Sequence, residues 1–337
     1  MIELIDLVVV GAGPCGIAVG AAAADRGLAS ALYEKGCITN SLVNYPYYMT
    51  FFSTARKLEI ADVPFTIAKD KPTRREALVY YRRVIQHHGL DVRQYEEVTS
   101  IEGSPGNFTI ETLTRDGRQD RVRAKAVVIA TGGFHEPNYL GVPGESLPKV
   151  HHYYREPYPF FDQDVLVVGA GNSSVESALE TYRAGARVTM VHFSEEIDHG
   201  VKPWVVPDIQ NRLKNEEILV YWGHRVAEIR DTTVVLQEER SGKTVEIPND
   251  WVLAMTGWRP NRELLVKLGV EIDDGTGIPT HDQDTMESNK EGIYIAGVLA
   301  AGYNANKIFI ENGKLHGPKI VRSIITSKVA DQDGASK

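Results

Sequence analysis

The stretch LVVVGAGPCGIAVGAAAADRG, residues 7 to 27, decides the fold of this chain. It begins with four apolar residues, typical of a parallel strand buried on both faces, and ends in an alanine-rich segment that favours a helix. Between them, Gly11, Gly13 and Gly16 match the pattern G-x-G-x-x-G of dinucleotide-binding units. Gly11 allows a tight turn, Gly13 lets a pyrophosphate approach the backbone, and Gly16 lets the helix pack closely on the strand.

A second strand, ASALYEKG from residue 29 to 36, follows this helix. Glu34 lies 21 residues after Gly13 (34 − 13 = 21), where a carboxylate would bind the ribose hydroxyls of an adenosine. Strand, turn, helix, strand and acid in this order make the prediction of a dinucleotide site much stronger than the glycines alone. Pro14 in the turn and Lys35 beside the acid complete the expected contacts of this first unit.

The chain carries a second unit of the same kind, DVLVVGAGNSSVESALETYRAGARVTMVHF, from residue 164 to 193. The residue 21 positions after its second glycine is neither an acid, which would favour NAD, nor an arginine, which would favour a 2′-phosphate (192 − 171 = 21). The choice of nicotinamide coenzyme therefore stays open at this stage. The expected contacts of this unit are Gly169, Gly171, Asn172, Ser173, Ser174 and His192.

Two further apolar strands, AKAVVIATGG (124–133) and WVLAMTGWR (251–259), end in Thr-Gly. These ends resemble the crossings between the FAD and NAD(P) domains of two-dinucleotide flavoproteins, in the thioredoxin-reductase-like branch of the pyridine nucleotide-disulfide oxidoreductases. The resemblance implies an α/β fold with two Rossmann-like domains, the NAD(P) domain being inserted into a split FAD domain. It adds Thr131, Gly132 and Gly257 to the cofactor contacts. The expected domains are residues 1–155 (FAD, first segment), 156–285 (NAD(P)) and 286–337 (FAD, second segment).

Longer segments resemble a narrower group, the bacillithiol disulfide reductase family. They are GAGPCG (11–16), EKG (34–36), NYPYYMTFFSTARKLEIADVPF (44–65), KPTRREALVYYRRV (71–84), KPW (202–204) and AGVLAAGYNANKIFIENGKLHG (296–317). The resemblance implies cofactor contacts at Phe52, Ser53, Gly297, Val298 and Asn306. Gly297-Val298 replaces the Gly-Asp pair of the wider flavoprotein family. A helix beginning near residues 303–306 is expected to point its positive end at the flavin.

The same resemblance implies a flavoprotein that passes a hydride from NAD(P)H through FAD to a low-molecular-weight disulfide, above all bacillithiol disulfide. Cys15 is then the thiol that meets the disulfide. Its place in the first turn of a helix favours the thiolate, although a small apolar packing role stays open. Cys37, the second of two cysteines, has no counterpart in the family pattern and is expected to be incidental. The family is associated with NADPH, and NADH is not excluded.

Composition and residue spacing limit the partners, the cellular location and the metal content that we expect. A net charge of −8 and a pI near 5.7 argue against nucleic acid as a partner. Two cysteines without a C-x-x-C motif predict a cytoplasmic enzyme, and we expect no membrane segment and a homo-oligomer. The adjacent pairs His87-His88 and His151-His152 point to opposite sides of any regular element, so we expect no metal.

Two other functions stay open from the sequence. The segments VVGAGNSSVESA (167–178) and PGESLPKVHHYY (143–154) also resemble flavin-dependent monooxygenases. A reductase of a protein or quinone acceptor without thiol chemistry is the other alternative. A helix over 74–88, with Thr73 and Glu76 as its capping box and Gly89 at its end, is predicted independently of function.

Overall fold

The computed structural model describes residues 3–334, and its internal contacts divide the chain into two units. The larger unit comprises Met1–Val43, Met49–Glu136 and Arg259–Lys337, and the smaller unit comprises Asn44–Tyr48 and Pro137–Trp258. One unit is therefore inserted into the other. The boundaries fall at 136/137 and 258/259, whereas the sequence led us to expect 155/156 and 285/286. That FAD belongs to the larger unit and NAD(P)H to the smaller stays a prediction.

The larger unit is built on a seven-stranded sheet. Its strands are β1 (Leu4–Val10), β2 (Ser30–Glu34), β3 (Asp91–Gln94), β4 (Glu96–Ser104), β5 (Asn107–Thr114), β6 (Gln119–Ile129) and β17 (Ile293–Ile295). The order is β3-β2-β1-β6-β5-β4, and β17 also pairs with β6. Strands β3, β2, β1, β6 and β17 run parallel, whereas β4, β5 and β6 form an antiparallel meander. The carboxyl ends of β1, β6 and β17 therefore meet at one edge.

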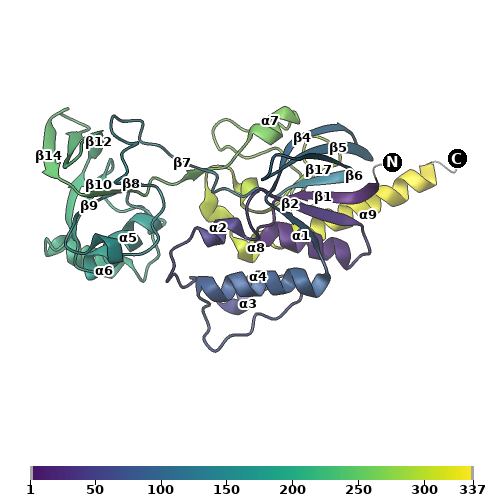
Figure 1. The fold of residues 1–337 in the computed structure, drawn as a ribbon, viewed down its shortest axis with the longest axis horizontal. Coiled ribbons are helices and arrows are strands. Elements are labelled where there is room, and N and C mark those ends of the chain that lie inside the picture. Colours follow the sequence, from purple (N-terminus) through teal and green to yellow (C-terminus); the bar gives the residue numbers. More distant parts are fainter. Residues whose placement is uncertain (1–2, 335–337) are drawn as a thin grey trace. The chain divides into compact units, whose positions relative to one another are not determined.

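Helices pack on this sheet. They are α1 (Pro14–Ala24), α2 (Asn40–Val43), α3 (Ala55–Leu58), α4 (Arg74–His88), α7 (Glu263–Lys267), α8 (Ile310–Gly313) and α9 (His316–Gly334), with 3₁₀ turns η2 (Gly297–Ala301) and η3 (Ala305–Lys307). Figure 1 shows α1 between the sheet and α4, with α9 alongside it. A Cβ on Gly317 of α9 would lie 2.7 Å from the Ala18 carbonyl oxygen, so the glycine permits a close approach of the two helices.

The smaller unit has a sheet of five parallel strands in the order β11-β10-β9-β15-β8 and a three-stranded antiparallel sheet, β12-β13-β14. These strands are β8 (Val150–His151), β9 (Asp164–Val168), β10 (Arg187–His192), β11 (Leu219–Trp222), β12 (His224–Ile229), β13 (Thr233–Glu238), β14 (Thr244–Pro248) and β15 (Trp251–Ala254). Its helices are η1 (Tyr158–Phe160), α5 (Asn172–Arg183) and α6 (Val206–Lys214). Each unit thus repeats strand, glycine turn, helix and parallel strand, which confirms the predicted fold class.

Two short strands, β7 (Glu136–Pro137) and β16 (Trp258–Arg259), carry the chain between the units and pair with each other. They follow shortly after the two Thr-Gly ends found in the sequence, so the crossing points were visible there. The expected boundaries lay further along the chain because they followed the proline-rich segment at 156–163. None of the helices in residues 3–334 is long and apolar enough to cross a bilayer.

The predicted helix over 74–88 is confirmed as α4. The Thr73 hydroxyl accepts a hydrogen bond from the Glu76 amide, the Glu76 carboxylate accepts one from the Thr73 amide, and Gly89 ends the helix with φ +59°.

The sequence led us to expect a helix beginning near residues 303–306, and this expectation is wrong. That segment forms only the short turn η3, and the long helix α9 begins at His316. A sequence rich in asparagine, NANKIF, favours local turns over a helix start, and the Asn304 side chain accepts a hydrogen bond from the Asn306 amide. The expected helix end pointing at the flavin is therefore not formed by these residues.

Candidate active site

The first glycine turn has the geometry that its sequence predicts. Gly11 has φ +108°, and a Cβ there would lie 2.5 Å from the carbonyl oxygen of Ala130. A Cβ on Gly16 would lie 2.0 Å from the Gly11 carbonyl oxygen, so both positions need glycine. At Gly13, by contrast, no described heavy atom lies within 4 Å of an ideal Cβ. The backbone is thus open where α1 begins with Pro14, as an approaching phosphate requires.

Glu34 ends β2 directly beside this turn. Its side chain is buried, with Oε2 accepting the Ala12 amide at 3.0 Å and Oε1 accepting the Gly36 amide at 2.9 Å. The carboxylate therefore fixes the turn to the end of the strand. Lys35, exposed, has its Nζ 2.9 Å from Nδ1 of His135, a residue that the sequence did not single out. Burial, followed by the charge of Lys35, lowers the pKa of His135.

The end of β6 lies at the same edge. The Ala130 amide donates to the Val10 carbonyl, and Thr131 follows as an exposed residue. Gly132 has φ +79°, and no described heavy atom lies within 4 Å of an ideal Cβ on it. The predicted contacts Gly13, Thr131 and Gly132 therefore share one open strand edge, the place where parallel α/β sheets bind ligands.

Cys15 lies in the first turn of α1 with its sulfur packed against two glycines. A Cβ on Gly297 would lie 2.9 Å from Cβ and 3.1 Å from Sγ of Cys15, and a Cβ on Gly313 would lie 2.8 Å from the same Sγ. Burial raises the pKa of the thiol to about 12. Cys15 is thus protonated at neutral pH, against the sequence argument that its helix position favours the thiolate. Within the described chain Cys15 and Cys37 are both free thiols.

Gly297 is held from its other side by His316. The Gly297 amide donates to Nδ1 of His316 at 3.1 Å, in a buried hydrogen bond. Burial, and then the charges of Lys319 and His281, lower the pKa of His316 to about 4, so the ring is neutral at physiological pH. Sequence reasoning missed His316 and Gly313, because neither stands in a pattern that indicates chemistry.

Side chains from α3 and the residues before it hold α8 in place. The Ser53 hydroxyl donates to Glu311 Oε1, and Lys57 Nζ lies 3.8 Å from Glu311 Oε2. Lys314 Nζ donates to the carbonyl oxygens of Lys57, at 2.8 Å, and Glu59, at 2.6 Å. Ser53, predicted to contact the cofactor, is therefore engaged with α8, the helix whose last residue, Gly313, contacts Cys15.

The remaining predicted contacts of the larger unit differ in their exposure. Phe52 and Val298 are half-buried, and a Cβ on Gly133 would lie 3.3 Å from Val298 Cγ1. Asn306 is exposed on η3. The aromatic run from residue 45 to 52 is divided, because Asn44–Tyr48 clusters with the smaller unit and the residues after it with the larger.

The glycine turn of the smaller unit repeats these features. Gly169 has φ +118°, and a Cβ there would lie 2.6 Å from Ser174 Oγ, which itself donates to the Met255 carbonyl at 3.2 Å. Asn172 ties the following loop to the turn: its Nδ2 donates to the Gly200 carbonyl and its Oδ1 accepts the Lys202 amide, both at 3.0 Å. Ser173 is exposed beside Gly171, at the start of α5. Gly257, with φ +85°, follows β15.

His192, at the end of β10, is only 6% exposed. Neither ring nitrogen has a hydrogen-bond partner among the described residues, although Nε2 lies 3.4 Å from Asp198 Oδ1. Burial is the main cause that lowers its pKa. The next residue, Phe193, has the guanidinium carbon of Arg225 4.5 Å from its ring centroid. The guanidinium of Arg225 thus lies beside the end of β10, although the glycine motif has histidine rather than arginine at position 192.

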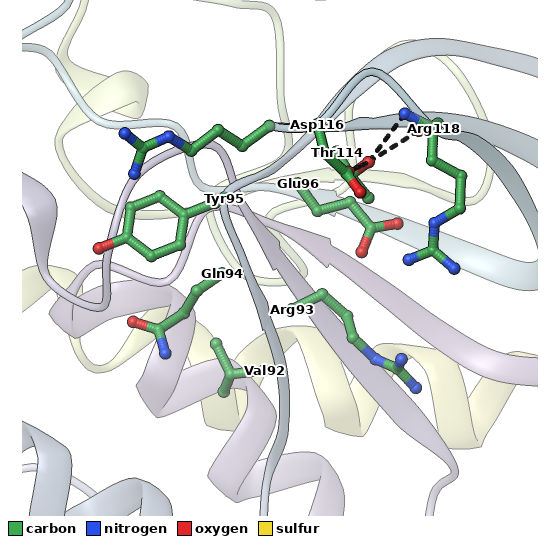
Figure 2. Close-up of a pocket in the computed structure, with 9 residues that line it drawn as sticks. Val92, Arg93, Gln94, Tyr95, Glu96, Thr114, Asp116 and Arg118 are labelled. Carbon is green, nitrogen blue, oxygen red and sulfur yellow. Dashed lines mark hydrogen bonds between the residues drawn. The ribbon is translucent and has the colours of Figure 1, made fainter.

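A shallow surface pocket lies at the edge of the larger unit. Figure 2 shows the residues of β3, β4 and the β5–β6 turn that line it. Its Gln94 accepts the Ile38 amide at 3.0 Å, and Tyr95, with φ +57°, donates its amide to the Gly36 carbonyl at 2.9 Å. The pocket therefore borders the loop after Glu34. Within residues 3–334 we find no group of three or more histidine, cysteine or acidic side chains arranged to hold a metal.

Comparisons with known proteins agree with this fold and give its family. A family model described as pyridine nucleotide-disulphide oxidoreductase matches residues 8–297. A protein named bacilliredoxin reductase Bdr, from Bacillus subtilis strain 168, is 44% identical over 94% of this chain and 96% of its own length. A solved structure of bacillithiol disulfide reductase Bdr from Bacillus cereus has a TM-score of 0.93 and 43% identity, covering 96% of this chain and all of the other. A thioredoxin reductase from T. acidophilum, at 24% identity and a TM-score of 0.76 over 97% of this chain and 99% of its own, shares the fold.

Proposed function

The chain belongs to the pyridine nucleotide-disulphide oxidoreductases and, within them, to the bacillithiol disulfide reductase family, and we propose that it reduces bacillithiol disulfide with electrons from NADPH. It is an FAD-dependent NAD(P)H oxidoreductase. Two electrons and two protons convert one disulfide to two thiols, and one NADPH with one proton supplies them. The observation that carries the proposal is Cys15, enclosed by glycines at the strand edge where the cofactor is expected.

The residues present fit FAD. The open backbone at Gly13 and the start of α1 can accept a pyrophosphate, and Gly132 leaves the strand edge clear. Glu34, at the end of β2 beside this turn, is the acid that would bind a ribose. When bound, FAD would supply two-electron transfer between a nicotinamide and a disulfide. Phe52, Ser53, Gly297, Val298 and Asn306 remain proposed contacts on the family resemblance.

Cys15 would open the substrate disulfide by exchange. Its thiolate attacks one sulfur, the disulfide breaks, one bacillithiol leaves as a thiolate, and the other half stays joined to Cys15. Two electrons and a proton then release the second bacillithiol and restore the Cys15 thiol. Because burial holds the pKa of Cys15 near 12, the exchange should accelerate as pH rises above neutrality.

The NADPH preference finds support in the smaller unit. Arg225, which also pairs with Glu239, brings a guanidinium beside Phe193, the residue after His192. The acids of the adjoining loop are engaged, since Glu195 pairs with Arg240 at 3.0 Å and Asp198 contacts His192. Arg225→Gln should raise the KM for NADPH about tenfold and leave that for NADH nearly unchanged. Arg230→Gln is the matched control, because this guanidinium pairs with Glu228 and Glu246. Equal effects of Arg225→Gln on both coenzymes would count against a role in selectivity.

A protein acceptor is the second candidate. The Bacillus subtilis relative is named for bacilliredoxin, and the raised pKa of the Cys15 thiol suits a reaction in which the acceptor rather than the enzyme supplies the reactive thiol. In this case NADPH oxidation would require the protein acceptor and would survive Cys15→Ala.

Initial rates of NADPH oxidation with a panel of acceptors test these candidates. The panel holds bacillithiol disulfide, glutathione disulfide, an oxidised bacilliredoxin, a quinone and oxygen, each with wild type, Cys15→Ala and Cys37→Ala. We expect turnover with bacillithiol disulfide, lost in Cys15→Ala and kept in Cys37→Ala. Turnover with the bacilliredoxin alone would favour the second candidate, and rapid oxidation by oxygen with a lasting oxygen adduct would favour a monooxygenase.

We also propose a cytoplasmic homo-oligomer. The reducing cytoplasm suits an enzyme whose two cysteines are both free and whose substrate is an intracellular thiol in its oxidised form. Light scattering during size exclusion would measure the oligomeric state directly.

A further inference from the structure

The contacts around Cys15 form a short series: thiol, glycine backbone and imidazole. Gly297 lies directly after β17, where the Ala296 amide donates to Ile129 of β6. It turns the chain with φ +72° and leaves room for the Cys15 sulfur on one side. Its amide donates to His316 at 3.1 Å. The backbone at Gly297 thus contacts both the thiol and the ring.

We propose that His316 is a positioning residue, which accepts the Gly297 amide proton at Nδ1, holds that backbone against the Cys15 thiol, and so sets how readily the thiol reacts. The proposal rests on the proposed function for the role of the thiol and not for the contact itself. It identifies a residue that shares no element with Cys15: the cysteine begins α1, whereas His316 begins α9.

The protonation state of His316 is fixed by this contact. Nδ1 can accept the Gly297 amide only when it carries no proton, so the ring is neutral with its proton on Nε2. Burial keeps this form, because a charged ring would have to be desolvated and would face Lys319. Without His316 the buried Gly297 amide would lose its acceptor, which is unfavourable unless the backbone moves. A movement of Gly297 would open the wall beside the Cys15 sulfur.

A second part of the same wall comes from α8, which has anchors of its own. Gly313, the last residue of α8, packs against the Cys15 sulfur. Glu311 of α8 contacts Ser53 and Lys57. Lys314, directly after α8, donates to the carbonyl oxygens of Lys57 and Glu59. A change at His316 should therefore loosen one side of the thiol site while the other side stays in place, which predicts an altered reactivity of Cys15 in a folded enzyme.

The test measures the rate at which iodoacetamide alkylates Cys15 in the FAD-loaded enzyme, in a Cys37→Ala background, by mass spectrometry. His316→Asn keeps an acceptor, because Oδ1 of asparagine stands as many bonds from Cα as Nδ1 of histidine. His316→Leu removes it. His281→Asn is the control, since His281 Nδ1 lies 2.6 Å from the Pro279 carbonyl and the residue has no hydrogen bond to Gly297 among the described contacts. We expect about a tenfold faster reaction in His316→Leu, and rates close to wild type in His316→Asn and the control.

Equal rates in His316→Leu and wild type would overturn the proposal, and so would equal acceleration in the leucine and asparagine variants. If His316→Leu does not fold, His316→Gln replaces it, because its acceptor stands one bond further out; a rate equal to that of His316→Asn would then overturn the proposal. No disulfide substrate enters this experiment. Its outcome is therefore independent of whether bacillithiol disulfide is the physiological acceptor, which the turnover assay decides.

Discussion

At the scale of single residues, the candidate site depends on two glycines, Gly297 and Gly313, that leave space for the Cys15 side chain. The Cys15 side chain fits here because Gly297 and Gly313 carry no side chain. The close packing removes water from the thiol and raises its pKa to about 12. A thiol with a raised pKa is oxidised slowly, because it is mostly protonated and the thiolate is the reactive form.

Gly313→Ala should destabilise the protein by about 1–3 kcal/mol, because the new Cβ would lie 2.8 Å from the Cys15 sulfur. Adding Cys15→Ala removes that sulfur and should recover most of the loss. Gly297→Ala is the contrasting case, since its φ of +72° and the contact with Cys15 Cβ at 2.9 Å both remain in the double variant. Urea unfolding of the three single variants and the two double variants measures the coupling. Equal rescue at both glycines would contradict the packing described here.

His316 should make stability depend on pH. Its pKa is lowered from 6.5 to about 4 in the folded chain, so between these values the unfolded chain binds a proton that the folded chain does not. The contribution of His316 to the free energy of unfolding should therefore be complete above pH 6.5. It should decrease as pH drops toward 4, by at most about 1.4 kcal/mol per pH unit. Unfolding at pH 7 and pH 5 should show a larger loss for wild type than for His316→Asn, which cannot titrate. Parallel losses would argue against a neutral His316.

At the scale of elements, the sequence signals that worked were those with a local physical cause. The strand, glycine turn and helix from residue 7 onward and the capping box of α4 were predictable, because each depends on neighbours within one turn or one strand. The hydrogen bond from Ala12 to Glu34 spans 22 residues, and this acid was found only because the glycine pattern fixes where it stands in the sequence. The start of α9 and the role of His316 were not predictable, because they depend on a contact 19 residues apart in sequence. The Cys15 pKa was misjudged for the same reason: the helix start is local, but the enclosing glycines come from the far end of the chain.

The cap of α4 gives a test at this scale. Thr73→Ala removes the acceptor for the Glu76 amide and should lower the free energy of unfolding by about 1 kcal/mol, within a range of about 0.5–2. Thr73→Ser keeps a hydroxyl in the same place and should stay within a few tenths of wild type. Thermal or urea unfolding measures both. A serine variant as unstable as the alanine variant would show that the methyl group, and not the cap, carries the effect.

At the scale of the whole molecule, two glycine turns in two units imply two nucleotides, one for each. The larger unit also holds Cys15, so the proposed reaction with the disulfide would take place there. The smaller unit holds the proposed contacts of the coenzyme, with His192 and Arg225 at the end of β10. The division into units was predictable from the two Thr-Gly ends. Their boundaries were less so, because strands of two residues leave almost no pattern in a sequence.

The most direct test of the central claim is an anaerobic single turnover. The FAD-loaded enzyme is reduced with one equivalent of NADPH and mixed with bacillithiol disulfide, while the visible flavin absorbance and the released thiols are followed together. The account predicts that the oxidised flavin spectrum returns, with two thiols released for each flavin, and that Cys15→Ala stays reduced. A wild-type enzyme that stays reduced, or a Cys15→Ala variant that is reoxidised equally fast, would contradict it.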